Sequence, residues 1–261
     1  VCKLSIPIYL AFSPEEAGEA AAASAHLACM GYQLAPDTPA LLAPSDAPEF
    51  PCMLLLQDST QPAYEPTPEL VQMIVQYAAA RHTGLLCDVS GKPTEFWLQM
   101  ITQLDRAAEE AKLSMWTTIT CADAAPHSAV LVPSPCVSGR YEDHLAQAAA
   151  RWPGRCVLEL RPLRCRMPLP CPVGNEILLS PQDLQAFLHR DPGGIYPWEP
   201  LRCMYKLVWE NGSPSLLLFD TPETMAEKVQ DAESAGFAAA VGLLQEAALF
   251  PMAPAPAPSQ T

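Results

Sequence analysis

Short apolar runs and amphipathic segments alternate along most of this chain. The runs include Leu4–Phe12, the stretch CMLLLQ at 52–57, GLLCDV at 84–89 and CVLEL at 156–160. Because they are apolar at successive positions, they are typical of strands buried on both faces, as in parallel sheets. The strand–helix alternation repeats about six to eight times. This predicts an α/β fold, either a barrel or a doubly wound sheet.

Three of the expected helices begin with the same pattern: a hydroxyl cap, a proline in the first turn and an acid near the positive helix end. The first is expected to run to Met30 and to stop at Gly31, the second to cover Leu70–Arg81, and the third to reach Gly236. The pattern stands at Ser13-Pro14-Glu15-Glu16, Thr67-Pro68-Glu69 and Thr221-Pro222-Glu223.

The remaining segments complete one expected barrel domain over residues 1–250, followed by a Pro/Ala-rich, extended or disordered tail over 251–261. The first strand lacks a following GxGxxG loop, which argues against a dinucleotide-binding fold. The sequence therefore predicts a (β/α)8 TIM-like barrel, irregular or with missing helices. Further strands are expected at 114–120, 128–132, 176–179, 204–209, 215–219 and 237–244, helices at 94–112, 138–152 and 181–189, and loops at 35–51, 161–172 and 191–200.

Charge and composition narrow the classes of partner. Lys+Arg 15 against Asp+Glu 29 gives a formal net charge of −14, which disfavours nucleic acid and anionic membrane surfaces. No stretch approaches the ~20 apolar residues of a membrane span. The five histidines show no metal-ligand spacing, so we expect neither a metal nor a cofactor.

The ten cysteines form no CxxC pair, and those in apolar segments, such as Cys29, Cys87 and Cys156, behave as small hydrophobes. We expect them to be reduced, which favours a cytoplasmic location. The chain starts at Val1 without a methionine, so export stays open. The trio Cys156, Cys165 and Cys171 is where a disulfide would be sought.

Two segments resemble family 18 glycoside hydrolases. Near the end, Leu217-Leu218-Phe219-Asp220-Thr221-Pro222-Glu223, then Lys228, Gly236 and an apolar strand, follow the order of features that closes the barrel in that family. The family commonly ends its last strand with a tryptophan that forms the floor of the sugar site. The nearest position here is Leu243.

The second segment is Thr83-Gly84-Leu85-Leu86-Cys87-Asp88-Val89-Ser90. In the family, this strand carries Asp-Gly-x-Asp-x-Asp-x-Glu, and the glutamate is the general acid. Gly84 and Asp88 match, Thr83 and Leu86 replace two aspartates, and Ser90 replaces the glutamate. A serine hydroxyl cannot supply a carboxylic proton, so the resemblance implies a barrel without hydrolysis of the family type.

Several polar or aromatic side chains are candidates for ligand binding. In a barrel the carboxyl ends of the strands line the ligand face, so four of the carboxylates are expected to converge there. Glu159 is either a pocket carboxylate or a partner of Arg161 or Arg164, and Asp88 is either a ligand contact or a loop-ordering residue. Tyr196 and Trp198 either stack on a sugar ring or form a hydrophobic plug. The candidates are Asp58, Asp88, Ser90, Glu159, Asp220, Tyr196 and Trp198.

Three functions stay open on the sequence. The first is a non-catalytic family-18-like barrel that binds carbohydrate or cell-wall fragments containing N-acetylglucosamine. The second is an active glycosidase or other hydrolase that uses a different carboxylate pair, such as Glu159 with Asp220 or Asp88. The third is a structural or interaction protein without a small-molecule site. Two close rim carboxylates with raised pKa values would favour the enzyme.

Overall fold

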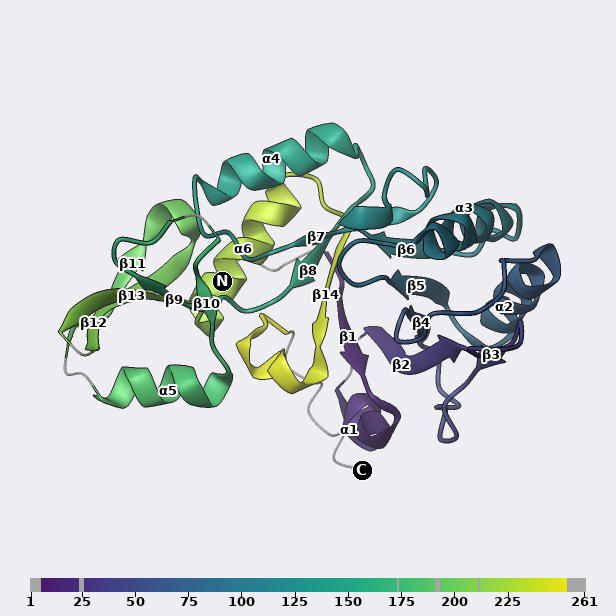
Figure 1. Ribbon diagram of the computed structural model, residues 1–261, viewed down its shortest axis with the longest axis horizontal. Helices are drawn as coiled ribbons and strands as arrows, with labels where there is room; N and C mark the ends of the chain where they lie inside the picture. Colours follow the sequence, from purple (N-terminus) through teal and green to yellow (C-terminus); the bar gives the residue numbers. More distant parts are fainter. Residues whose placement is uncertain (1–5, 24–25, 173, 191–192, 211, 253–261) are drawn as a thin grey trace, which may run out of the picture.

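Eight parallel strands form a closed barrel in the computed structural model (Figure 1), which describes residues 6–23, 26–172, 174–190, 193–210 and 212–252. The sheet closes because β1 pairs with both β2 and β14. A two-residue strand, β3 (Leu41–Leu42), runs antiparallel to the end of β2. The predicted barrel is therefore confirmed. In spatial order its strands are β1 (Ile8–Phe12), β2 (His26–Leu34), β4 (Met53–Gln57), β5 (Gly84–Asp88), β6 (Met115–Thr118), β7 (Ala129–Pro133), β8 (Cys156–Leu160) and β14 (Ala239–Leu243).

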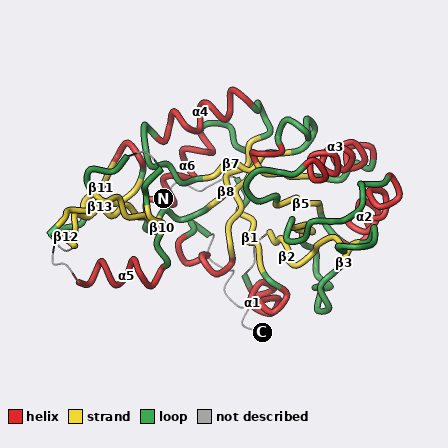
Figure 2. The backbone as a smooth tube through the Cα atoms, viewed as in Figure 1, coloured by secondary structure: helices red, strands yellow, loops and turns green. Residues whose placement is uncertain are grey.

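The helical layer around this barrel is incomplete (Figure 2). Within the described residues, the connection from β2 to β4 holds no helix, and the one from β6 to β7 holds only the 3-10 turn η2 (Ile119–Cys121). Another 3-10 segment, η4 (Leu244–Leu249), follows β14. The expected irregularity is thus present. The covering helices are η1 (Pro14–Glu16), α1 (Ala17–Ala22), α2 (Pro68–Arg81), α3 (Glu95–Glu110), α4 (Tyr141–Arg151) and α6 (Pro222–Ser234).

The three capping motifs act as predicted. Thr67 Oγ1 accepts a hydrogen bond from the backbone N–H of Leu70, and Thr221 does the same for Thr224. Glu16 accepts from the backbone N–H of Ser13 in a capping box. Each cap satisfies N–H groups that a helix start leaves without an internal partner.

The expected length of the first helix is wrong. It ends at Ala22, and the stretch from His26 through Met30 belongs to strand β2. Leu27, Ala28 and Cys29 are all buried between the neighbouring strands β1 and β4. Pairing on both sides satisfies the backbone there, and this tertiary gain outweighs the high helix propensity of the alanine-rich sequence.

The barrel interior is filled by alternate residues of its strands. Tyr9 and Trp116 meet edge to face at 4.7 Å, and Tyr9 stacks on His26, which closes the end where β1 and β2 begin. Above them lies a layer of aliphatic side chains from every second position. The interior cluster comprises Ala11, Ala28, Met53, Leu55, Leu86, Trp116, Leu131, Val157, Ala239 and Val241.

Between β8 and α6 the chain leaves the barrel and forms a second, antiparallel sheet at one side of it (Figure 1). One face of this sheet packs on α5 (Pro181–Arg190) through Leu184, Val208 and Phe219. The strands expected at 204–209 and 215–219 are confirmed, and they pair with each other in antiparallel fashion. The sheet has the order β10 (Ile177–Leu178), β9 (Arg164–Pro168), β13 (Ser213–Phe219), β12 (Cys203–Glu210) and β11 (Tyr196–Trp198), with η3 (Glu199–Leu201) between β11 and β12.

Two segments expected to be loops are strands of this sheet. Arg164–Pro168 pairs with β13, and Tyr196–Trp198 pairs with β12. Their prolines and arginines hide the apolar alternation that marks a strand. They are strands only because they pair with β12 and β13. For β9 these partners lie more than 30 residues further along the sequence.

No helix within the described residues is long and apolar enough to cross a membrane. The nine cysteines of that part of the chain are free thiols, including Cys156, Cys165 and Cys171. Of the predicted tail, residues 253–261 lie outside the described residues.

Candidate functional site

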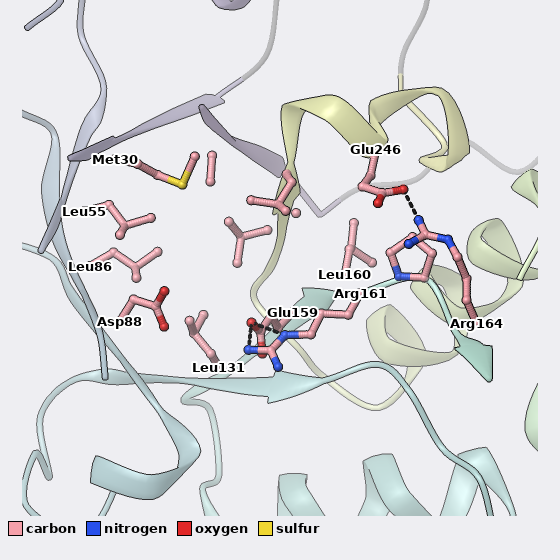
Figure 3. Close-up of a pocket in the computed structure, with 15 residues that line it drawn as sticks. Met30, Leu55, Leu86, Asp88, Leu131, Glu159, Leu160, Arg161, Arg164 and Glu246 are labelled. Atoms are coloured by element: carbon pink, nitrogen blue, oxygen red, sulfur yellow. Dashed lines mark hydrogen bonds and ion pairs between the residues drawn. The ribbon is translucent and has the colours of Figure 1, made fainter. Parts of the chain in front are cut away.

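A pocket of about 390 Å³ opens at the carboxyl ends of the barrel strands (Figure 3). This end is where barrel enzymes hold their ligands, because the strand-to-helix loops surround it. Aliphatic side chains cover most of the wall, and five charged residues stand around them. The lining residues are Ala11, Met30, Leu55, Leu86, Asp88, Leu131, Glu159, Leu160, Arg161, Pro162, Arg164, Val241, Gly242, Leu243 and Glu246.

Asp88 is the last residue of β5, and its carboxylate points into the pocket (Figure 3). It lies two positions after the inward-facing Leu86, so the strand period of two places it on the inner face. The carboxylate makes no hydrogen bond or ion pair with any described residue. Burial raises the pKa of Asp88. The nearby Arg161 lowers it, and Asp58 raises it further.

Glu159 reaches the same pocket from β8. Its Oε1 accepts a hydrogen bond from Nε of Arg161 at 2.6 Å, and a second guanidinium nitrogen of Arg161 completes the ion pair. Burial raises the pKa of Glu159, although the Arg161 pair opposes this. The pairing of Glu159 with an arginine, one of the two options open on the sequence, is therefore the observed one, and it occurs within the pocket.

A second ion pair closes the opposite wall. Arg164, the first residue of β9, contacts Glu246 in η4. Both side chains are mostly buried. The pair ties the start of the inserted sheet to the end of the barrel and gives the pocket a fixed rim.

Ser90 lies in a smaller lobe that continues from the main pocket and shares Asp88, Leu131, Glu159 and Arg161 with it. The backbone N–H of Ser90 donates to Asp58 Oδ2 at 2.9 Å, so Asp58 orders the loop that follows β5. This lobe has a volume of about 250 Å³, and hydroxyl groups of Ser90, Thr118 and Thr120 stand on its wall. Of the predicted convergent carboxylates, Asp58, Asp88 and Glu159 thus gather at this end of the barrel.

Asp220 does not join them. Its carboxylate is fully buried and accepts from Nζ of Lys228 at 2.7 and 2.8 Å. It also accepts from the backbone N–H of Leu163 at 2.7 Å and from the hydroxyl of Thr224. Leu163 stands where the chain leaves the barrel and Asp220 where it returns. Asp220 therefore fastens the inserted sheet rather than facing the pocket.

Tyr196 and Trp198 also lie apart from the pocket, on β11 of the inserted sheet. Trp198 packs edge to face on Tyr205 at 5.3 Å and is half-buried against that sheet. Tyr196 is 55% exposed. Their role in stacking on a sugar stays a prediction.

The sequence reasoning missed Glu246, the Arg164 pair and the aliphatic wall. The aliphatic wall could have been predicted from the sequence. Leu55, Leu86 and Val241 each lie two positions before the end of their strand, so the strand period of two places them on the inner face near the rim. No sequence pattern predicted the role of Glu246, since it lies 82 residues after its partner Arg164. Leu243, at the position where the family places tryptophan, does line the pocket and is 45% exposed. No cluster of metal-ligating side chains occurs among the residues that the structure describes.

Comparison with known proteins defines the class of fold. No protein-family model matches the sequence, and no curated protein is significantly similar to it. Solved structures match nearly the whole chain. A chitinase from Rhizomucor miehei is 12% identical with a TM-score of 0.62, covering 93% of this chain and 98% of that one. The spore cortex-lytic enzyme SleL of Bacillus cereus is 12% identical with a TM-score of 0.64, covering 92% and 71%.

A chitinase from Chromobacterium violaceum ATCC 12472 is 14% identical, with a TM-score of 0.61 and coverage of 91% and 93%. At these identities the likeness concerns the fold. The fold is thus that of a chitinase-like barrel, here with an antiparallel insertion before the last strand, and it agrees with the fold that the sequence resemblance implied.

The unpaired Asp88 leads to a prediction on stability. Its pKa is raised in the folded state, so the folded protein holds the proton more strongly than the unfolded chain, and stability falls as pH rises through this interval. Asp88→Asn removes that penalty. We expect the variant to be more stable than the parent at pH 7 and the difference to vanish below about pH 3.8, the ordinary aspartate value. Thermal unfolding of both proteins across this range measures it, and a difference independent of pH would contradict it.

Proposed function

We propose that this protein is a non-catalytic chitinase-like barrel that binds carbohydrate containing N-acetylglucosamine. The observation that carries the proposal is the open pocket at the carboxyl ends of the strands, with Asp88 directed into it and Ser90 beside it. The structures with a similar fold are chitinases and a spore cortex-lytic enzyme, and this supports a carbohydrate ligand by analogy.

Binding is supported by the chemistry of the rim. The Asp88 carboxylate is a half-buried acceptor to which no side chain or N–H of the described residues donates, so a ligand N–H or O–H would compensate for its lost hydration. The hydroxyl of Ser90 can donate and accept, as sugar hydroxyls require. Thr118 Oγ1 already donates to the carbonyl oxygen of Val89 and lies 3.1 Å from Thr120 Oγ1, so these two hydroxyls offer a ligand acceptor positions. The ion pairs of Arg161 and Arg164 hold the walls in place before a ligand arrives, which lowers the entropic cost of binding.

Absence of hydrolysis is supported by the position of Ser90. It occupies the place of the general acid in the family pattern, with its side chain exposed and its N–H held by Asp58. Glu159 is the other carboxylate that lines both lobes of the pocket. It is ion-paired with Arg161, and an ionised carboxylate has no proton to give.

An active hydrolase is the second candidate, and one observation favours it. Asp88 and Glu159 line one pocket, and burial raises the pKa of both. Carboxyls with raised pKa values in a cleft are typical of acid–base catalysts. This candidate requires Glu159 to leave Arg161 and to hold a proton when substrate binds.

Calorimetric titration with N-acetylglucosamine oligomers tests the proposal. Asp88→Ala is expected to weaken binding about 10- to 100-fold, the value of a hydrogen bond to a charged group. Asp143→Ala, which removes an exposed aspartate of α4, is the matched control and is expected to bind as the parent does.

A parallel assay for released sugar separates the candidates. Cleavage by the parent that is lost in both Asp88→Ala and Glu159→Gln would establish the hydrolase and refute the non-catalytic proposal. If no oligomer binds at millimolar concentration, the proposed carbohydrate function is wrong, and a structural or interaction role takes its place.

A further inference from the structure

The larger lobe of the pocket has an unusual lining for a sugar site. Its wall is built from aliphatic side chains on seven barrel strands or their ends, among them Met30, Leu55, Leu86 and Leu243. Among the described lining residues none is aromatic, and none carries a neutral hydroxyl or amide. Sugar rings are held by flat aromatic faces and by many neutral hydrogen-bonding groups, whereas an aliphatic wall gains free energy only by covering hydrocarbon.

The smaller lobe has the opposite character. Ser90, Thr118 and Thr120 contribute hydroxyls, and Gly91 lines the lobe beside them with no other atom within 4 Å of the position that a Cβ would take. The two lobes meet at Asp88, Leu131, Glu159 and Arg161. The site as a whole is therefore amphipathic, with hydrocarbon on one side and hydroxyls on the other.

The residues where the two lobes meet favour a particular chemical group in the middle of a ligand that fills both lobes. The carboxylates of Glu159 and Glu246 are each neutralised by an arginine in an ion pair. The Asp88 carboxylate forms no ion pair or hydrogen bond within the described part of the chain, although Arg161 lies near it. A ligand that crosses the junction is favoured when it presents a hydrogen-bond donor to Asp88, because a half-buried acceptor without a donor destabilises the complex.

We infer that the ligand is an N-acylated amino sugar whose acyl chain is longer than acetyl. The sugar ring occupies the hydroxyl lobe, the amide N–H donates to Asp88, and the hydrocarbon chain extends over Leu55, Leu86 and Leu243. This inference rests on the proposed carbohydrate function and names the class of sugar that the site prefers.

Titration with a series of methyl glycosides tests it. The probes are N-acetyl-, N-butanoyl- and N-hexanoyl-glucosamine glycosides, with hexyl glucoside as a probe that has a chain but no amide. Each methylene placed on the aliphatic wall is expected to tighten binding about fourfold, or about fifteenfold for each step of two carbons. Hexyl glucoside is expected to bind at least tenfold more weakly than the N-hexanoyl probe, because it offers Asp88 no amide donor.

Two matched variants test whether the acyl chain of the ligand lies on the aliphatic wall. Leu243→Asn places a polar group on the wall, and we expect it to reduce the gain for each methylene. Leu42→Asn changes a leucine of similar exposure, 41% against 45%, on β3 away from the pocket, and is expected to keep the parental gain. Both positions are exposed, so both variants are expected to fold, and thermal unfolding checks this.

The failures of the two proposals differ. If the N-acetyl probe and its oligomers bind but affinity does not rise with chain length, the acyl inference is wrong and the carbohydrate function stands. Equal binding of hexyl glucoside and the N-hexanoyl probe would refute the role of the amide at Asp88. If no probe binds, both proposals are wrong.

Discussion

Replacing Asp220 by alanine is expected to destabilise the protein by about 3–5 kcal/mol. The substitution leaves the ammonium of Lys228 fully buried without its counter-charge. It also removes the acceptor for the backbone N–H of Leu163 and for the hydroxyl of Thr224. The ring of Tyr141, 5.6 Å from Nζ, offers the ammonium only a weak substitute. Urea-induced unfolding, followed by circular dichroism, measures the loss.

The control for this prediction is the exposed pair of Arg151 and Asp123, in which both side chains are more than half exposed. Asp123→Ala is expected to cost less than about 1 kcal/mol, because water screens such pairs. The double variant Asp220→Ala/Lys228→Met removes both buried charges and is expected to recover part of the stability. A cost for Asp220→Ala as small as that of Asp123→Ala would show that the buried pair does not hold the insertion.

The second large effect concerns catalysis. Hydrolysis of N-acetylglucosamine oligomers is expected to be about 10²–10⁴-fold slower than by a barrel with glutamate at the position of Ser90, the usual contribution of a general acid. A chromogenic di-N-acetylglucosamine substrate, assayed beside the chitinase of Rhizomucor miehei, measures the ratio. The Asp88→Ala variant serves as the control for contaminating activity and is expected to give the same background rate as the parent.

A rate within tenfold of that chitinase, lost in Asp88→Ala, would contradict the prediction. Its dependence on pH would then identify the acid. Burial raises the pKa of Glu159, so activity that falls with rising pH and disappears in Glu159→Gln would assign the proton to that residue.

The local sequence specified much of the fold. Ser13, Thr67 and Thr221 predicted three helix starts, since a cap depends on residues within one turn. The apolar runs that became β4, β5 and β8 were recognised because parallel strands are covered on both faces. The segment of β2 was misassigned because its alanines favour a helix in isolation.

The candidate site was predicted only in part. Asp88, Asp58 and Glu159 were found because carboxyl ends of parallel barrel strands share one edge, a rule that needs only the order of elements. Asp220 also follows a strand directly, yet that strand belongs to the antiparallel insertion, so its carboxylate reaches Lys228 instead of the pocket. The sequence pattern around Asp220 is similar to the patterns around Asp58 and Asp88. What distinguishes Asp220 is that its strand belongs to the inserted sheet and not to the barrel.

The sequence by itself determined the class of fold and the helix starts, and its family resemblance predicted that Ser90 stands in the place of the acid, since each depends on residues close together in the chain. Tertiary structure decided that β9 and β11 are strands and that Arg161 and Arg164 neutralise Glu159 and Glu246. It also left the Asp88 carboxylate without an ion pair or hydrogen bond to any residue that the structure describes. These features depend on contacts up to 82 residues apart, and the free energy of such contacts depends on burial and distance, which residue order does not contain.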